Sequence, residues 1–318
     1  MKQLFLNLLS LAFLSGLVSA QTLTETFGSG ANAFTMDFVT IGNPGNTADT
    51  TGSPNPVGSV AYNYNLGKYE VSRDMITKAN SAGSLGIALQ DISSFGGNGV
   101  DRPATGISWY EAAKFVNWLN TNQGYQEAYK FSGSSFQLWS AGDAGYNANN
   151  MFRNSQAKYV IASTDEWHKG AYGHADGSWS NFPNGSDSAP IPVSSGTYAN
   201  TAVYWQSAYN GPADINNAGG LSPFGTMAQG GNVWELTETA YDGTNDTAGE
   251  LRNLRGGSWA DYGSNQLDAS NINNYNPSDE LYIIGFRVAS VPEPSSSFLL
   301  LIGVAGVVSG RLLKRKGW

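Results

Sequence analysis

The side chains that most often carry acid–base, nucleophilic or metal chemistry are scarce in this sequence. Its 318 residues include no cysteine and two histidines, His168 and His174. Either histidine could be placed in a Ser-His-Asp triad, but no Gly-x-Ser-x-Gly nucleophile elbow accompanies them. His168 follows Trp167 in a predicted helix, where we expect a surface or capping residue. The histidines therefore give little support to nucleophilic hydrolysis.

Carboxylates are more numerous and offer a second kind of acid–base chemistry. Asp165 with Glu166, or Asp279 with Glu280, could serve glycoside hydrolysis if the fold set two carboxylates at the required separation. Adjacent charged side chains normally lie in solvent, and we expect these pairs to do so. The 25 acidic and 17 basic residues give a net charge of −8. Because binding to phosphate backbones requires clustered lysine and arginine, nucleic acid is excluded as a partner.

The elements that would position such side chains depend on glycine-rich turns. Residues 230–235 read Gly-Gly-Asn-Val-Trp-Glu, residues 255–259 read Arg-Gly-Gly-Ser-Trp, and residues 285–289 read Gly-Phe-Arg-Val-Ala. Paired glycines let the backbone adopt conformations closed to other residues, and the aromatic residues supply large apolar anchors. With 39 glycines and 12% aromatic residues, the chain is expected to form one large, loop-rich domain over residues 21–290.

Two capping boxes predict the clearest helices. Ser108 and Glu111 form the first box, and Ser163 and Glu166 form the second. After Ser108 the apolar residues recur with helical spacing, which predicts a helix with one buried face. That face consists of Trp109, Ala112, Ala113, Val116 and Leu119.

The remaining elements are predicted from weaker signals. Ser72 could begin a short helix that runs through Ala79, and alternation over residues 60–64 predicts a strand before it. Residues 43–57 and 173–230 are rich in Gly, Asn, Ser and Pro, so we expect loops there. Long irregular stretches of this kind are usually functional or mobile.

Five sequence blocks in this order resemble the sulfatase-modifying-factor, or formylglycine-generating-enzyme-like, family. The family's fold is a variant of the C-type lectin fold. The resemblance covers roughly residues 34–290 and implies an α+β fold, in which short helices pack on small antiparallel sheets. The blocks are residues 38–42 with 66–72, residues 107–113, residues 163–167, residues 230–235 and residues 255–259.

The resemblance also implies where catalysis would occur, and the required residues are missing there. The family's oxidase chemistry uses two cysteines after the Gly-Gly-Ser-aromatic motif to hold copper, but Asp261 and Gln266 stand at those positions. Carboxylate and amide oxygens are hard ligands and cannot replace thiolates at a copper(I) centre. A related branch binds non-haem iron through three histidines, one more than this chain has. We therefore expect no copper and no activity of the family's oxidase type.

A calcium site is a further implication of the resemblance. Its ligands in the family are backbone carbonyls, the Glu of the Asn-x-Trp-Glu motif and an acidic or amide side chain seven residues earlier, where this chain has Ala228. Oxygen-only ligation suits Ca²⁺. Alternatively, Glu235 could tie down its loop by accepting backbone N–H bonds, and both interpretations stay open. The matching positions are Gly231, Val233 and Glu235, with Asn200 and Asp214 for a second site.

Aromatic residues in the long polar loop suggest a ligand-binding surface. Rings that alternate with amide and hydroxyl side chains can stack on a sugar or a protein while the amides supply hydrogen bonds. The alternative is that each ring packs beneath its own loop as a local core. The predicted ligand-binding residues are Trp179, Tyr204, Trp205 and Tyr209, with Phe182 beside them.

Both ends of the chain have the composition of targeting signals. Residues 1–20 have a lysine, an apolar run and a small-residue ending, which predicts a secretory signal peptide cleaved before Gln21. At the other end, Pro-Glu-Pro at residues 292–294 precedes an uncharged run over 296–310 and a basic tail. The run is short for a transmembrane helix, and its basic end should stay cytoplasmic.

This C-terminal pattern over residues 291–318 resembles the PEP-CTERM sorting signal, which a membrane-embedded exosortase recognises in Gram-negative bacteria that make extracellular polysaccharide. The resemblance implies a protein anchored transiently in the inner membrane and then placed at the cell surface or in the extracellular matrix. A plain single-span anchor is the alternative.

Two hypotheses for function follow. The first is a non-catalytic binding or structural protein that binds extracellular polysaccharide or a surface protein. The second is an enzyme of the same family with a remodelled site around Asp261, Gln266, Arg287 and the histidines. A deep pocket with converging polar groups near Asp261 would favour catalysis, and an aromatic-lined surface would favour binding.

Overall fold

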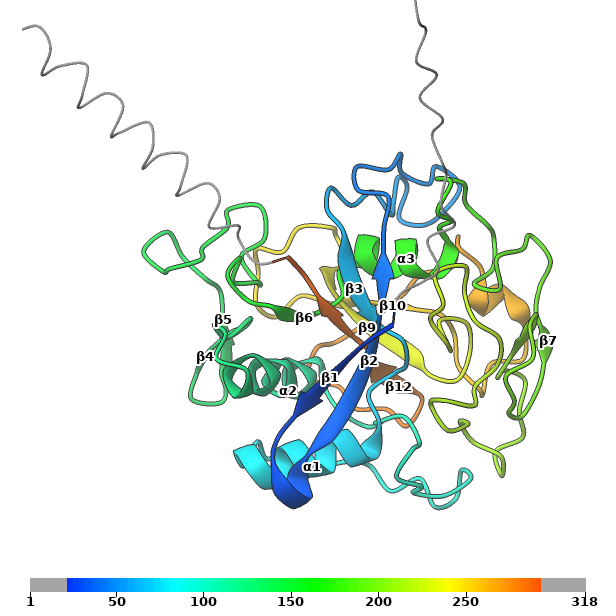
Figure 1. Ribbon diagram of the computed structural model, residues 1–318, viewed down its shortest axis with the longest axis horizontal. Helices are drawn as coiled ribbons and strands as arrows, with labels where there is room; N and C mark the ends of the chain where they lie inside the picture. Colours follow the sequence, from blue (N-terminus) through cyan, green and yellow to red (C-terminus); the bar gives the residue numbers. More distant parts are fainter. Residues whose placement is uncertain (1–21, 293–318) are drawn as a thin grey trace, which may run out of the picture.

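A five-stranded antiparallel sheet forms the centre of the protein, which the computed structural model describes over residues 22–292 (Figure 1). Its order is β1-β2-β3-β13-β6, so strands from the two ends of the described chain lie in one sheet. The strands are β1 (Thr22–Phe27), β2 (Phe34–Ile41), β3 (Tyr64–Gly67), β13 (Val288–Ser290) and β6 (Tyr159–Ile161).

A second sheet of four strands is joined to the first by a single residue. Its order is β11-β10-β9-β12, with β12 parallel to β9 and the other pairs antiparallel. The chain leaves β12 at Phe286 and enters β13 of the first sheet at Val288, so Arg287 lies at the junction of both sheets. The strands are β11 (Asn273–Tyr275), β10 (Arg252–Arg255), β9 (Trp234–Ala240) and β12 (Ile284–Phe286).

Three α-helices flank these sheets: α1 (Arg73–Gly83), α2 (Trp109–Asn122) and α3 (Thr164–Tyr172). Both predicted capping boxes are confirmed, because Ser108 Oγ accepts from Glu111 N at 3.3 Å and Ser163 Oγ accepts from Glu166 N at 3.2 Å. Helix α1 begins after Ser72 as predicted but continues four residues beyond Ala79.

The strand predicted over residues 60–64 is wrong. Strand β3 begins at Tyr64, and residues 60–63 form no ladder. Val60 N instead donates to Asn46 Oδ1 at 3.2 Å, and Gly45 N donates to Val60 O at 2.7 Å. The alternation of residues 60–64 therefore reflects a segment that pairs with the preceding loop.

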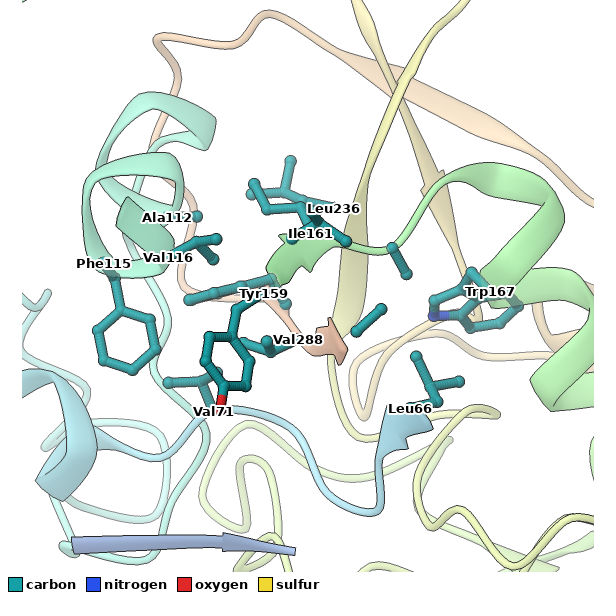
Figure 2. Packing of buried hydrophobic residues seen from close by; sticks show 14 of the residues in the cluster. Leu66, Val71, Ala112, Phe115, Val116, Tyr159, Ile161, Trp167, Leu236 and Val288 are labelled. Atoms are coloured by element: carbon teal, nitrogen blue, oxygen red, sulfur yellow. The ribbon is translucent and has the colours of Figure 1, made fainter. Parts of the chain in front are cut away.

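The main hydrophobic core lies between α2, α3 and the two sheets (Figure 2). The predicted apolar face of α2 is confirmed, because all five of its residues are fully buried. Figure 2 shows Ala112 and Val116 of α2 beside Tyr159, and Trp167 of α3 near Leu66. Burying about 150–250 Å² for each such ring makes aromatic residues large contributors to this core.

Beyond the core, the chain from residue 173 to 233 and the turn over 256–268 form what we call the loop half. It has little regular structure and lies on the side of the molecule opposite α2 (Figure 1). Two small apolar clusters support it, one around Val203 and Trp259 and one around Phe182 and Tyr204. The elements not yet named are β4 (Lys130–Ser132), β5 (Ser135–Gln137), β7 (Ile191–Pro192), β8 (Thr201–Ala202) and the 3-10 helices Gly30–Asn32 and Ser264–Leu267.

The α+β, loop-rich architecture agrees with the fold class predicted from the sequence. Within residues 22–292, no helix has the length and apolar character needed to cross a bilayer. The predicted signal peptide (residues 1–20) and the apolar run over 296–310 lie outside the described residues.

Candidate functional site

The Gly-Gly-Ser-Trp turn holds the adjoining loop by backbone hydrogen bonds. Trp205 N donates to Asp261 O at 2.9 Å, and Gln206 N donates to Trp259 O at 2.8 Å. Gly257 has a φ of +74°, and a Cβ there would lie 2.9 Å from Leu267 Cδ1. Only glycine fits this position without strain. The turn that the sequence singled out therefore sets the position of residues 203–211.

Asp261 and Gln266, the positions that correspond to the family's cysteines, both lie in this turn. Asp261 Oδ2 accepts from Ser258 N at 2.7 Å and from Ser258 Oγ at 2.9 Å. Gln266 lies in the 3-10 helix Ser264–Leu267, with its Cβ 3.1 Å from where a side chain on Gly257 would begin. The Asp261 carboxylate is thus part of the turn's own hydrogen bonding.

Three large aromatic side chains project from these two segments into solvent. Trp205 is 61% exposed, Tyr209 87% and Tyr262 80%, and we call these three residues the aromatic face. Rings this exposed do not line a closed pocket. The sequence indicated Trp205 and Tyr209 but missed Tyr262, whose one signal was its place directly after Asp261 in a glycine-bounded turn.

The other two predicted ligand-binding rings have a different environment. Tyr204 is buried and its hydroxyl donates to Pro190 O at 2.6 Å. Trp179 is half-buried, with its ring centroid 5.4 Å from that of His168. Phe182 is also buried. These three rings therefore pack beneath their own loops, as the alternative interpretation of the aromatic residues predicted.

Glu235, the proposed calcium ligand, is fully buried and bound by side chains. Arg287 Nε donates to its Oε2 at 2.6 Å, Arg287 Nη2 to its Oε1 at 2.5 Å, and Trp167 Nε1 to Oε2 at 2.6 Å. These N–H donors are side chains, which differs from the alternative interpretation in which backbone N–H groups bind Glu235. Burial, together with the charge of Glu235, raises the pKa of the neighbouring Glu70 carboxyl well above its usual value.

The other residues predicted to bind calcium each have a different protein partner in the structure. Gly231 N donates to Gly256 O at 2.8 Å, and Asn200 O accepts from Ile191 N at 2.8 Å. Asp214 forms an ion pair with Arg102 at 3.4 Å. Residues 22–292 contain no group of three or more His, Cys, Asp or Glu side chains placed to hold a metal ion. Calcium at Gly231, Val233, Glu235 and Asn200 stays a prediction.

The expectation that His168 lies at the surface is wrong. The ring is fully buried between Asp49, whose Oδ2 is 3.0 Å from Nε2, and Arg255, whose Nη2 donates to Nδ1 at 2.8 Å. Because Nδ1 accepts from a guanidinium, the neutral ring donates from Nε2 to Asp49. Burial lowers the pKa of His168 to about 4, against the opposing effect of the Asp49 hydrogen bond. Its partners lie in loop 43–57 and β10, so His168 joins three segments.

The two adjacent acidic residues Asp165 and Glu166 have different environments. Asp165 is exposed, whereas Glu166 is buried and was wrongly expected in solvent. Arg153 binds Glu166 Oε2 at 2.9 Å and Glu238 Oε2 at 2.8 Å. Burial opposes ionisation of Glu166, but the Arg153 guanidinium outweighs it and lowers the pKa of Glu166 to about 2. Asp279 and Glu280 are exposed, as expected.

The larger clefts lie away from the Asp261 turn. One of about 410 Å³ is lined by the β1–β2 strands and the start of α1. Another of about 390 Å³ lies between the end of α1, α2 and the β4–β5 hairpin. A small hollow of about 10 Å³ borders Ala228 and Gln229. None of these three is lined by Asp261, Gln266 or the aromatic face.

Comparisons with known proteins agree with this geometry. The profile described as "Sulfatase-modifying factor enzyme 1-like domain" matches residues 31–291, and that of the PEP-CTERM protein-sorting motif matches residues 290–316. A comparison with curated proteins finds no match.

Several solved structures share the fold at 18% sequence identity. Treponema denticola variable protein 1 has a TM-score of 0.57 and covers 85% of this chain and 99% of its own. CarF has a TM-score of 0.56 with coverages of 81% and 99%. PvdO from Pseudomonas aeruginosa has a TM-score of 0.52 with coverages of 84% and 98%.

Proposed function

The chain belongs to the sulfatase-modifying factor enzyme 1-like family and carries a PEP-CTERM sorting motif, and on this premise we propose that it is an exported, non-catalytic binding protein. The motif implies export to the envelope of a Gram-negative bacterium and processing by exosortase sorting. The proposed ligand is an extracellular polysaccharide, and the proposed site is the aromatic face.

The observation that carries this proposal is the position of the three exposed rings. Trp205, Tyr209 and Tyr262 lie on the turn that bears Asp261 and Gln266, and on the loop that this turn holds. In the family resemblance this turn carries the catalytic cysteines. Large rings that stay exposed on adjoining segments are a feature of ligand-binding surfaces. Their flat faces suit stacking on a sugar ring.

The backbone of Trp205 supports the same interpretation. Its φ of +55° lies in the left-handed region, which is unfavourable for a bulky residue by about 1–2 kcal/mol. Such strain persists only where the surroundings impose it and is concentrated at functional sites. Here the Asp261 carbonyl accepts from Trp205 N at 2.9 Å and fixes the strained residue with its ring in solvent.

The test is calorimetric titration of residues 22–292 with the exopolysaccharide of the producing organism. We expect binding by the native protein and about a tenfold loss of affinity for each of Trp205→Ala, Tyr209→Ala and Tyr262→Ala. Tyr241→Ala is the matched control, because Tyr241 is 51% exposed but lies outside the loop half. Equal binding by all four variants, or none by the native protein, would contradict the proposal.

Two additional measurements complete this test. Titration with and without added calcium shows whether the predicted ion at Gly231, Val233 and Glu235 contributes to affinity. Turnover by the purified protein, with a redox metal bound in stoichiometric amount beside Asp261, would contradict a non-catalytic role.

A further inference from the structure

The charges around the aromatic face restrict the kind of ligand that it can accept. Residues 203–211 and 256–268, which build the face, contain no lysine or arginine, and their charged residues are Asp261 and Asp268. The adjoining segment 93–99 has no charged residue. Its Phe95 ring stacks on Tyr282, with centroids 4.4 Å apart, and lies tilted against Trp259, with centroids 5.7 Å apart. The face therefore carries no cation of its own.

The arginines that adjoin these segments are already bound to protein groups. Arg255 and Arg287 are fully buried, and each guanidinium binds protein acceptors. Arg102 lies beside loop 93–99, but it forms an ion pair with Asp214 and donates to Gly96 O at 3.3 Å. An anionic ligand would have to lose water without gaining an opposite charge, which is unfavourable.

The polar groups that are available are neutral. Asn265, Gln266 and Ser264 lie beside Tyr262, and their side chains make no hydrogen bond within the described residues. The hydroxyls of Tyr209 and Tyr262 are also without a protein partner in the described structure. Amides and hydroxyls both donate and accept, so they complement the hydroxyl groups of a sugar.

From this combination we infer that the aromatic face selects uncharged glycans and rejects polysaccharides that carry carboxylate or sulfate groups. The inference rests on the proposed function and names the ligand class of the same site. The rings would stack on pyranose faces, and the free amides would bind ring hydroxyls. Asp261 and Asp268 contribute only negative charge, and both carboxylates are engaged, with Ser258 and Ser270 respectively.

The test separates the producer's exopolysaccharide into neutral and acidic pools by anion exchange and measures binding of residues 22–292 to each pool. We expect binding to the neutral pool, and an affinity that changes less than about twofold between about 50 and about 500 mM NaCl, because screening acts only on charges. Binding confined to the acidic pool would overturn the inference but leave the proposed function standing. Binding to neither pool would overturn the proposed function itself.

A charge variant provides the second arm. Asn265 is exposed on the 3-10 helix beside Tyr262, so Asn265→Lys places a cation on the face with little effect on the fold. We expect this variant to gain binding to the acidic pool, with an affinity that falls about tenfold over the same salt range. Asn149→Lys, an exposed site in another loop, is the matched control. If both variants gain equally, local charge at the face does not determine selectivity and the inference is wrong.

Discussion

Trp109 in α2 and Trp205 in the loop half show how differently two regions of this protein use the same residue type. Trp109 is fully buried, donates from Nε1 to Thr237 O at 3.1 Å, and has the Arg252 guanidinium 4.6 Å from its ring. Trp205 is held through its backbone, and its ring is exposed. The Trp109 ring is part of the hydrophobic core, whereas the Trp205 ring is part of the protein surface and depends on the fold for its position.

The difference shows how loops without disulfides can be held in place by backbone hydrogen bonds and small apolar clusters. In the loop half, small apolar clusters around Val203 and Tyr204 pack against the chain, and backbone hydrogen bonds join residues 205–206 to residues 259–261. We therefore expect the exposed rings to contribute little to stability. Mutations can test whether the buried residues stabilise the fold while the exposed rings do not.

The largest expected effect compares the two tryptophans. Trp109→Ala should lower the free energy of unfolding by about 3–5 kcal/mol, because it removes a buried ring and leaves a cavity. Trp205→Ala should change it by less than about 0.5 kcal/mol. Urea unfolding measures both, and Trp109→Phe serves if the alanine variant does not fold. Equal losses of unfolding free energy at the two positions would show that both rings stabilise the fold to the same extent, contrary to this prediction.

The pH dependence of stability tests the contact between loop 43–57 and α3. Burial lowers the pKa of His168 from 6.5 to about 4, so the unfolded chain takes up this proton first as the pH falls. The contribution of His168 is complete above pH 6.5 and is lost as the pH falls to 4, by up to about 3 kcal/mol.

Urea unfolding at several pH values between these limits measures this loss. His168→Gln should flatten the dependence, while His174→Gln, at a half-buried position outside this network, should not. Persistence of the full slope in the His168→Gln variant would show that other groups cause it. The Asp49 and Arg255 side chains face His168 from loop 43–57 and β10, so their variants provide a further check.

The smallest expected effect concerns the helix caps. Ser108→Ala removes the acceptor for Glu111 N and should cost about 1 kcal/mol. Ser207→Ala, on the loop beside Trp205, replaces an exposed side chain and should leave the unfolding midpoint unchanged. A cost at Ser207 as large as that at Ser108 would mean that side chains of the loop half also stabilise the fold.

The helices were predictable because their signals are local. Each capping box spans four residues, and the α2 apolar face repeats within 14 residues. Strand β3 was misplaced because the alternation over 60–64 says nothing about which segment lies opposite. Pairing between β2 and β3, and between β3 and β13, decides the strand's limits, and these partners are distant in sequence.

The site could be predicted only in outline. The Asp261 turn and the exposed Trp205 and Tyr209 followed from motifs and composition, but Tyr262 has no pattern that separates it from a buried tyrosine. His168 was misjudged because its partner Asp49 lies 119 residues away. Long-range contacts of this kind decide burial and leave no local periodicity.

Trp205 also gives the protein an optical probe of its own surface. Among the tryptophans within residues 22–292, it is the one with most of its side chain in solvent, at 61% exposed. Iodide or acrylamide should therefore quench its fluorescence before that of the buried indoles, and its emission should lie at longer wavelength. A molecule that covers this indole would shield it from the quencher, so occupancy can be followed without attaching a dye.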